Sequence, residues 1–205
     1  MALLAQRLAA AGTPVFRFDR RGVGDSEGEN RGYASSAPDI AAALAAFRRE
    51  QPHVARVVAF GNCDAATALI LSPCGFDALV LANPWLGDEA ASPPPAALRA
   101  YYVRRLRDPA TWVALMTNGF KRKVKSLAGA FTAAREEPLA ALVTQALAQR
   151  PATVILATGD RTAQIFDAGV RLPFGLRPIR IDTASHSFAG HMDDLESILL
   201  QAVRA

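Results

Sequence analysis

The sequence predicts an α/β fold, and three observations support this prediction. Apolar runs of strand length recur along the chain and are bounded by glycine, proline or polar residues. Segments with helical periodicity separate these runs. The runs are apolar almost throughout, which is typical of parallel strands that are buried on both faces. We therefore expect a mostly parallel sheet with helices on both faces.

The size and composition indicate a single folded domain. The chain has 205 residues, of which 51% are hydrophobic and 20% are charged. This length allows one sizeable core but not two comfortable ones, and the composition is that of a globular protein. We therefore take residues 1–205 as one domain.

The individual elements follow the hydrophobic pattern along the chain. The signals Ser36, Pro38 and Asp39 start the second helix, and Gly12 ends the first. The predicted helices cover residues 3–11, 36–52, 64–73, 161–170 and 192–204, and the predicted strands lie within 13–19, 55–61, 75–85, 152–159 and 179–185.

Residues 93–150 interrupt this alternation. The segment is too long for one crossover, and it contains the run "SPPP", two tyrosines and Trp112. We interpret it as a helical cap inserted over the carboxyl edge of the sheet.

A cysteine lies at the corner between the strand 55–61 and the helix 64–73. The sequence there is G-x-C-x-A, from Gly61 to Ala65, which has the shape of a nucleophile elbow whose usual form is G-x-S-x-G. Small residues at both ends suit so tight a turn. The sulfur of Cys63 would lie beside a helix N-terminus, whose dipole and free N–H groups favour a thiolate. We therefore expect an activated Cys63 with a lowered pKa.

A structural role for this cysteine stays open, because free cysteine is often buried as a small hydrophobe. Cys74 has no elbow around it and is expected in the core.

A cysteine nucleophile needs a histidine base and an acid that orients it. In this fold class they follow the nucleophile in the order acid, histidine, each on the loop after a strand. His186 follows the last predicted strand and is the predicted base. His53 precedes the nucleophile strand, and His191 lies near the start of the final helix, where a surface or capping role is expected.

The predicted acid is Asp160, which follows the strand 152–159 after a glycine turn. Asp167 lies inside the next helix and is the weaker candidate. A simple helix-capping role for Asp160 stays open.

These segments resemble a known family. "FDRRGVGDSEG", residues 18–28, resembles the D-x-R-G-x-G-x-S loop of α/β-hydrolases, and the elbow, "GDRTAQIF" and "TASHSF" extend the resemblance over nearly the whole chain. G-x-C-D-A-A-T-A resembles the cysteine-nucleophile type called exosortase A system-associated hydrolase 1, which occurs with bacterial exopolysaccharide and protein-sorting loci. The resemblance implies Cys63 as nucleophile, Asp160 as acid, His186 as base and the Asp64 N–H as an oxyanion-hole donor.

The resemblance also predicts an N-terminally truncated version of this fold. Members of the superfamily normally begin with strands and an H-G-type loop before the helix at 3–11. One such strand normally lies in the sheet between the strands at 13–19 and 55–61, and the loop supplies the second oxyanion donor.

Two functions are compatible with these features. The first is a hydrolase or acyl transferase that acts on an ester or thioester through Cys63, Asp160 and His186, associated with exopolysaccharide and exosortase systems. The alternative is a catalytically inactive binding or scaffolding protein that uses the basic face at Lys121, Arg122 and Lys123.

The remaining features limit the partners. The net charge of +4 comes without zinc spacing or a helix-turn-helix pattern, so nucleic acid is not expected, and the basic run at 120–126 is either a solvated helix face or a contact for an anionic partner. We expect no cofactor and no metal, and a small-molecule or lipid-linked acyl substrate. No run of about 18 apolar residues predicts a membrane span. The two cysteines form no disulfide framework, which favours a reducing, cytoplasmic location.

Overall fold

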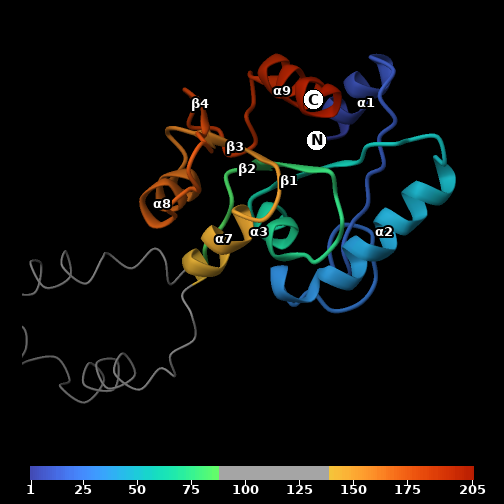
Figure 1. The fold of residues 1–205 in the computed structure, drawn as a ribbon, viewed down its shortest axis with the longest axis horizontal. Coiled ribbons are helices and arrows are strands. Elements are labelled where there is room, and N and C mark those ends of the chain that lie inside the picture. Colours follow the sequence, from blue (N-terminus) through green and yellow to red (C-terminus); the bar gives the residue numbers. More distant parts are fainter. Residues whose placement is uncertain (88–138) are drawn as a thin grey trace, which may run out of the picture. The chain divides into compact units, whose positions relative to one another are not determined.

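The computed structural model describes residues 1–87 and 139–205, and their core is a parallel sheet (Figure 1). All strand pairs in this sheet are parallel, and the strand order follows the chain, β1-β2-β3-β4. The strands are β1 (Val58–Asn62), β2 (Ala78–Ala82), β3 (Ala152–Ala157) and β4 (Ile179–Ile181). The predicted α/β class with a parallel sheet is confirmed.

Helices connect and flank these strands. α3 joins β1 to β2, α7 precedes β3, α8 joins β3 to β4, and α9 follows β4. The helical elements are α1 (Ala2–Ala10), the 3₁₀ turn η1 (Tyr33–Ser35), α2 (Ala37–Glu50), α3 (Asp64–Leu71), α7 (Leu139–Leu147), α8 (Arg161–Gly169) and α9 (Met192–Arg204).

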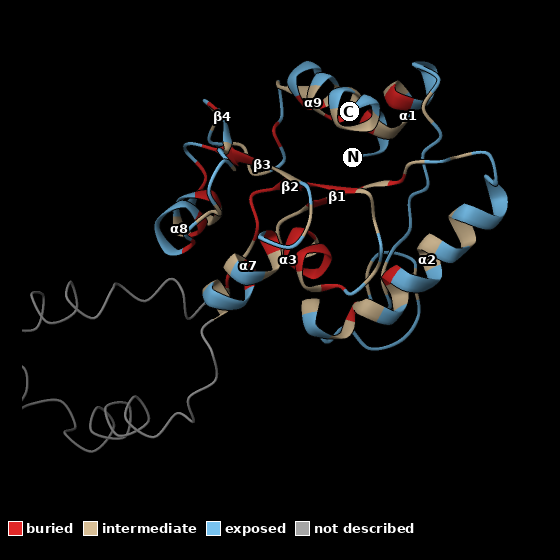
Figure 2. Ribbon diagram, in the orientation of Figure 1, coloured by how far each residue is buried: buried red, intermediate tan, exposed pale blue. Residues whose placement is uncertain are grey.

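The two faces of the sheet carry separate apolar clusters, as the strand alternation requires. In β2, Leu79 and Leu81 contribute to the cluster that contains residues of α2, α3, α7 and α8. Val80 and Ala82 contribute to the cluster that contains residues of α1 and α9. Figure 1 shows α1 and α9 on one side of the sheet with α2, α3 and α7 on the other, and Figure 2 shows β2 and most of β3 as buried.

The predicted strand at residues 13–19 is wrong. This segment has no regular secondary structure, and Val15, Phe16 and Phe18 are each about 40% exposed, at 38%, 42% and 42%. Apolar alternation favours a strand only where a neighbour lies about 4.8 Å away and can share the backbone hydrogen bonds. In the described part of the chain, no strand pairs with residues 13–19.

Ser36, a predicted start signal of α2, does not cap this helix with its side chain. The residue precedes the helix, but its hydroxyl makes no capping bond and instead donates to the Gly32 carbonyl at 3.0 Å. Pro38 and Asp39 lie in the first turn as predicted.

The predicted cap at 93–150 lies mostly outside the described residues. Its last part does not: α7 contributes Val143 and Leu147, which are 0% and 3% exposed, to the cluster on one face of the sheet. These residues belong to the compact unit that contains the sheet, Met1–Leu86 with Leu139–Ala205.

Candidate active site

The turn between β1 and α3 forms a strained corner at Cys63. The residue has φ 60° and ψ −127°, and α3 begins directly after it. Non-glycine residues rarely adopt such a left-handed conformation, and where they do the site is often functional. The corner predicted from the G-x-C-x-A pattern is present.

Gly61 makes this corner sterically feasible. A Cβ at this position would lie 2.8 Å from both the Ala65 carbonyl carbon and the Ala66 nitrogen. These are backbone atoms of α3, which cannot move aside as a flexible side chain could. The close approach of strand and helix therefore requires glycine.

Hydrogen bonds from β2 and the segment after it hold the corner in place. The Cys63 N–H donates to the Ala82 carbonyl at 3.0 Å, and the Trp85 N–H donates to the Cys63 carbonyl at 3.3 Å. Both polar groups of the cysteine backbone are thus satisfied despite the unusual dihedral angles.

Burial decides the protonation of the cysteine. The half-buried position raises the pKa of the Cys63 thiol, while a hydrogen bond from the Asp64 N–H lowers it by a smaller amount. The nearby charges of Asp64 and Asp160 raise the pKa further, and that of Arg20 lowers it. The expectation of a lowered pKa is therefore wrong, because loss of solvent outweighs the hydrogen bond from the Asp64 N–H.

Asp160 and His186 lie together at the carboxyl ends of β3 and β4. The Oδ1 atom of Asp160 is 3.1 Å from Nδ1 of His186. The Asp160 residue is 9% exposed, and the His186 side chain is 41% exposed. The other carboxylate oxygen of Asp160 accepts a 3.0 Å bond from the Ala163 N–H. Asp160 therefore caps α8 and contacts the histidine at the same time.

The structure links this pair to the cysteine corner through asparagine side chains that bind the His186 backbone, rather than through the sulfur. In the described residues, no hydrogen bond joins the Cys63 thiol to His186. The His186 carbonyl instead accepts from the side-chain amides of Asn62, at 3.3 Å, and Asn83, at 3.1 Å. Asn62 immediately precedes Cys63, so the histidine loop lies at the corner.

A family model provides the decisive comparison. The model described as the alpha/beta hydrolase family matches residues 1–197. This chain belongs to the alpha/beta hydrolase family. The family is generally hydrolytic, and no curated protein matches the chain in sequence.

Solved structures with this fold resemble the chain at low sequence identity. The enol-lactonase from Burkholderia xenovorans LB400 has a TM-score of 0.55 and 19% identity, over 100% of this chain and 86% of that one. The putative non-heme bromoperoxidase BpoC from Mycobacterium tuberculosis H37Rv has a TM-score of 0.53 and 18% identity, over 98% and 85%. An alpha/beta hydrolase from Sphaerobacter thermophilus DSM 20745 has a TM-score of 0.51 and 21% identity, also over 98% and 85%. These likenesses concern the fold.

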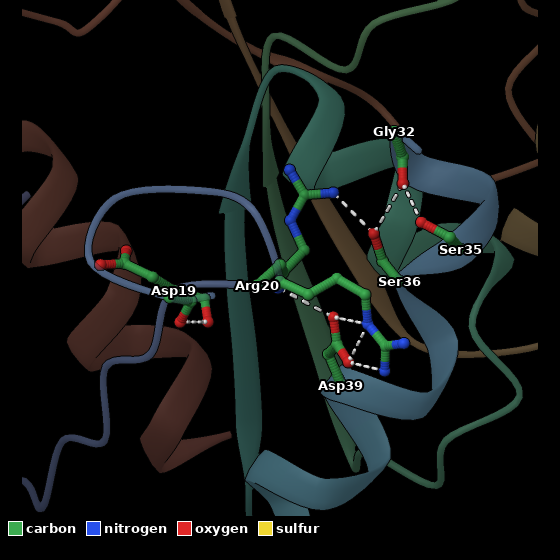
Figure 3. A network of polar contacts seen from close by, with 8 residues as sticks. Asp19, Arg20, Gly32, Ser35, Ser36 and Asp39 are labelled. Carbon is green, nitrogen blue, oxygen red and sulfur yellow. Dashed lines mark hydrogen bonds and ion pairs between the residues drawn. The ribbon is translucent and has the colours of Figure 1, made fainter. Parts of the chain in front are cut away.

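In this alpha/beta hydrolase, the D-R-R-G loop contacts the elbow through a residue that sequence reasoning did not single out. One nitrogen of the Arg20 guanidinium lies 2.6 Å from an Asp64 carboxylate oxygen, and another donates to the Ser36 hydroxyl at 2.7 Å. Figure 3 shows the Arg20 side chain reaching Ser36 at the start of α2. The adjacent Arg21 pairs with Asp39 and lowers the pKa of that carboxyl.

The weaker candidates lie away from this arrangement. Asp167 pairs with Arg180, and His191 precedes α9 without a side-chain capping bond and contacts Asp194 at 3.0 Å. His53 is exposed, and Cys74 is half-buried against the core.

Residues 1–87 and 139–205 offer neither a group of three or more metal-ligating side chains nor a helix long and apolar enough to span a membrane. The basic residues Lys121, Arg122 and Lys123 lie outside these ranges.

Proposed function

We propose that this chain is an acyl hydrolase or acyl transferase that acts on an ester or thioester through Cys63, Asp160 and His186. One observation carries the proposal. A cysteine in a strained strand-to-helix turn lies at the same edge of the sheet as a hydrogen-bonded carboxylate–imidazole pair. This combination provides a nucleophile, a base and a group that orients the base.

The hydrogen bond between Asp160 and His186 supports a separate role for each nitrogen of the imidazole. Nδ1 of His186 faces Asp160, which leaves Nε2 as the atom that takes the thiol proton from Cys63. Because burial raises the pKa of this thiol, the resting form is protonated and the base is needed to generate the nucleophile.

The thiolate then attacks the carbonyl carbon of the substrate, and a tetrahedral oxyanion forms. The Asp64 N–H, which points toward the sulfur, is one donor for this oxyanion. Collapse of the intermediate breaks the ester or thioester bond, and His186 returns the proton to the leaving group. Water or another acceptor then releases the acyl group from the sulfur.

We further propose a bacterial exopolysaccharide or exosortase system as the setting, a small-molecule or lipid-linked acyl substrate, and a cytoplasmic location. The setting rests on the resemblance of the G-x-C-D-A-A-T-A elbow and the "SHSF" segment to the cysteine-nucleophile subfamily, and the location rests on the two cysteines, which form no disulfide framework.

The test is the turnover of p-nitrophenyl acetate and of acetyl-CoA by the wild type, Cys63→Ala and His186→Ala. Cys74→Ala is the matched control, because Cys74 is also half-buried but lies outside the corner. We expect both substitutions in the site to remove turnover while circular dichroism stays unchanged, and Cys74→Ala to retain it. Equal turnover in the wild type and Cys63→Ala would rule out the proposal.

One observation favours the alternative of a catalytically inactive binding protein. No hydrogen bond joins His186 to the Cys63 thiol within residues 1–87 and 139–205. An alpha/beta hydrolase fold with an idle cysteine would show no turnover in any variant, and iodoacetamide would alkylate Cys63 equally with and without His186.

A further inference from the structure

Asn83 is a buried polar residue at the carboxyl end of β2. It is 0% exposed and has φ 41°, an unusual value for a residue other than glycine. A buried amide with unpaired donors or an unpaired acceptor is destabilising, so its partners show what holds it there. Both ends of this amide are paired.

Its two partners belong to the segments that carry the acid and the histidine. The Asn83 Oδ1 atom accepts a 2.9 Å bond from the Ala157 N–H, at the end of β3 and three residues before Asp160. The Asn83 Nδ2 atom donates to the carbonyl of His186 at 3.1 Å. One side chain therefore connects the strand that leads to the acid with the loop that carries the base.

The neighbouring strand supplies a second donor to the same carbonyl. In the register of β1 with β2, Asn62 lies opposite Ala82, so the corner and Asn83 are adjacent at the carboxyl edge. Asn62 Nδ2 donates to the His186 carbonyl at 3.3 Å. Asn62 Oδ1 is buried and has no partner within residues 1–87 and 139–205, so the bond to His186 is the hydrogen bond that this side chain makes there.

We propose that Asn83 is a positioning residue, assisted by Asn62, which fixes the backbone of His186 so that the imidazole keeps its hydrogen bond to Asp160. The proposal rests on the proposed function in one respect, namely that this imidazole is the base. The hydrogen bond between His186 and Asp160 selects the Nδ1–H tautomer, because the carboxylate accepts from Nδ1.

The test measures the tautomer of His186 by long-range ¹H–¹⁵N correlation NMR at a pH where the ring is neutral. The three histidines of the chain are assigned by single His→Gln substitutions. We expect His186 of the wild type to be in the Nδ1–H form, and we expect a larger share of the Nε2–H form in Asn83→Ala. Asn83→Asp should behave in the same way, because it keeps the size and an acceptor for the Ala157 N–H but loses the amide donor.

Thr67→Val is the matched control. Thr67 is also 0% exposed, and its hydroxyl donates to the Trp85 carbonyl rather than to the histidine loop. Its replacement should lower stability without changing the tautomer. An unchanged His186 tautomer in a folded Asn83 variant would overturn the proposal; if neither Asn83 variant folds, Asn62→Ala decides in the same way.

A second readout separates this proposal from the proposed function. If the wild type shows Cys63-dependent ester turnover, Asn83→Asp should lower kcat on the order of a hundredfold with KM little changed, because the base is misplaced and substrate binding is not. A wild type without such turnover contradicts the proposed function, while the tautomer of His186 still tests the role of Asn83.

Discussion

Cys63 adopts a left-handed backbone conformation, with φ 60°, at the point where β1 turns into α3. Strain of this kind costs on the order of 1–3 kcal/mol and persists only where the surroundings enforce it. Here the Ala82 carbonyl and the Trp85 N–H hold the cysteine backbone, and Gly61 allows α3 to approach. The conformation of Cys63 therefore depends both on the hydrogen bonds of this corner and on the absence of a Cβ at Gly61.

The first residue-scale prediction concerns the dependence of stability on pH. The ordinary pKa of the thiol is 9.0, and burial raises it in the folded chain, so the folded state holds the Cys63 proton more tightly. The resulting stabilisation is fully present below pH 9.0 and is lost as the pH rises through the folded pKa.

Urea unfolding of the wild type and Cys63→Ser between pH 7 and about pH 10 measures this effect. The unfolding free energy of the wild type, taken relative to that of Cys63→Ser, should decline above the ordinary thiol pKa. Cys74→Ser, which keeps Cys63, should show the same decline relative to Cys63→Ser. A difference that grows with pH would mean that the folded state favours the thiolate.

The second residue-scale prediction is that Gly61→Ala destabilises the fold by about 1–3 kcal/mol, because the new methyl group would overlap the backbone of α3. Gly75→Ala is the control, since a Cβ there would have no atom within 4 Å. Urea unfolding should show a change within about 0.5 kcal/mol for this control. Equal effects of the two substitutions would contradict the close approach at Gly61.

At the scale of elements, the segment before η1 is attached to two helices through arginine. Arg20 contacts Asp64 at the start of α3 and Ser36 next to α2, and its side chain is only 13% exposed. Hydrogen bonds to charged groups are worth more than neutral ones, and a shielded guanidinium is costly to leave unpaired. This contact keeps the loop and the elbow together.

We therefore predict that Arg20→Met lowers the unfolding free energy by about 1–3 kcal/mol. Arg31→Met is the matched control, because Arg31 and its partner Glu29 are both 71% exposed, and such a surface pair should contribute less than about 1 kcal/mol. Thermal or urea unfolding of both variants checks this. A loss for Arg31→Met as large as that for Arg20→Met would show that burial of the contact is unimportant.

At the scale of the whole molecule, parallel topology brings residues distant in sequence to one edge. Cys63, Asp160 and His186 follow three different strands of the sheet, and the carboxyl ends of parallel strands meet at the same edge. The helices that pack on its two faces stabilise this sheet. α7 is part of that cover, although the sequence predicted its residues as part of a cap.

The packing of α7 yields a prediction within one helix. Leu147 is 3% exposed and Leu142 is 39% exposed, so Leu147→Ala should cost about 2–5 kcal/mol and Leu142→Ala clearly less. Urea unfolding of the two variants is the measurement. Similar losses would show that this helix is not packed on the sheet.

Local patterns in the sequence were sufficient for much of the fold. The α/β class, all four described strands and the order of the helices follow from apolar periodicity and from glycine, proline and capping signals, and strand ends differ from the prediction by a few residues. The positions of Cys63, Asp160 and His186 at strand ends follow from the same patterns. Their catalytic roles stay predictions.

Features that depend on distant neighbours do not follow from these local patterns. Residues 13–19 have the apolar pattern of a strand but no strand beside them, and α7 belongs to the core because its apolar side chains find the sheet. Burial raises the pKa of the Cys63 thiol, and the Asn83 side chain donates to a carbonyl 103 positions away in the chain. Pairing, burial and long-range hydrogen bonds are properties of the folded arrangement, so periodicity and short motifs cannot encode them.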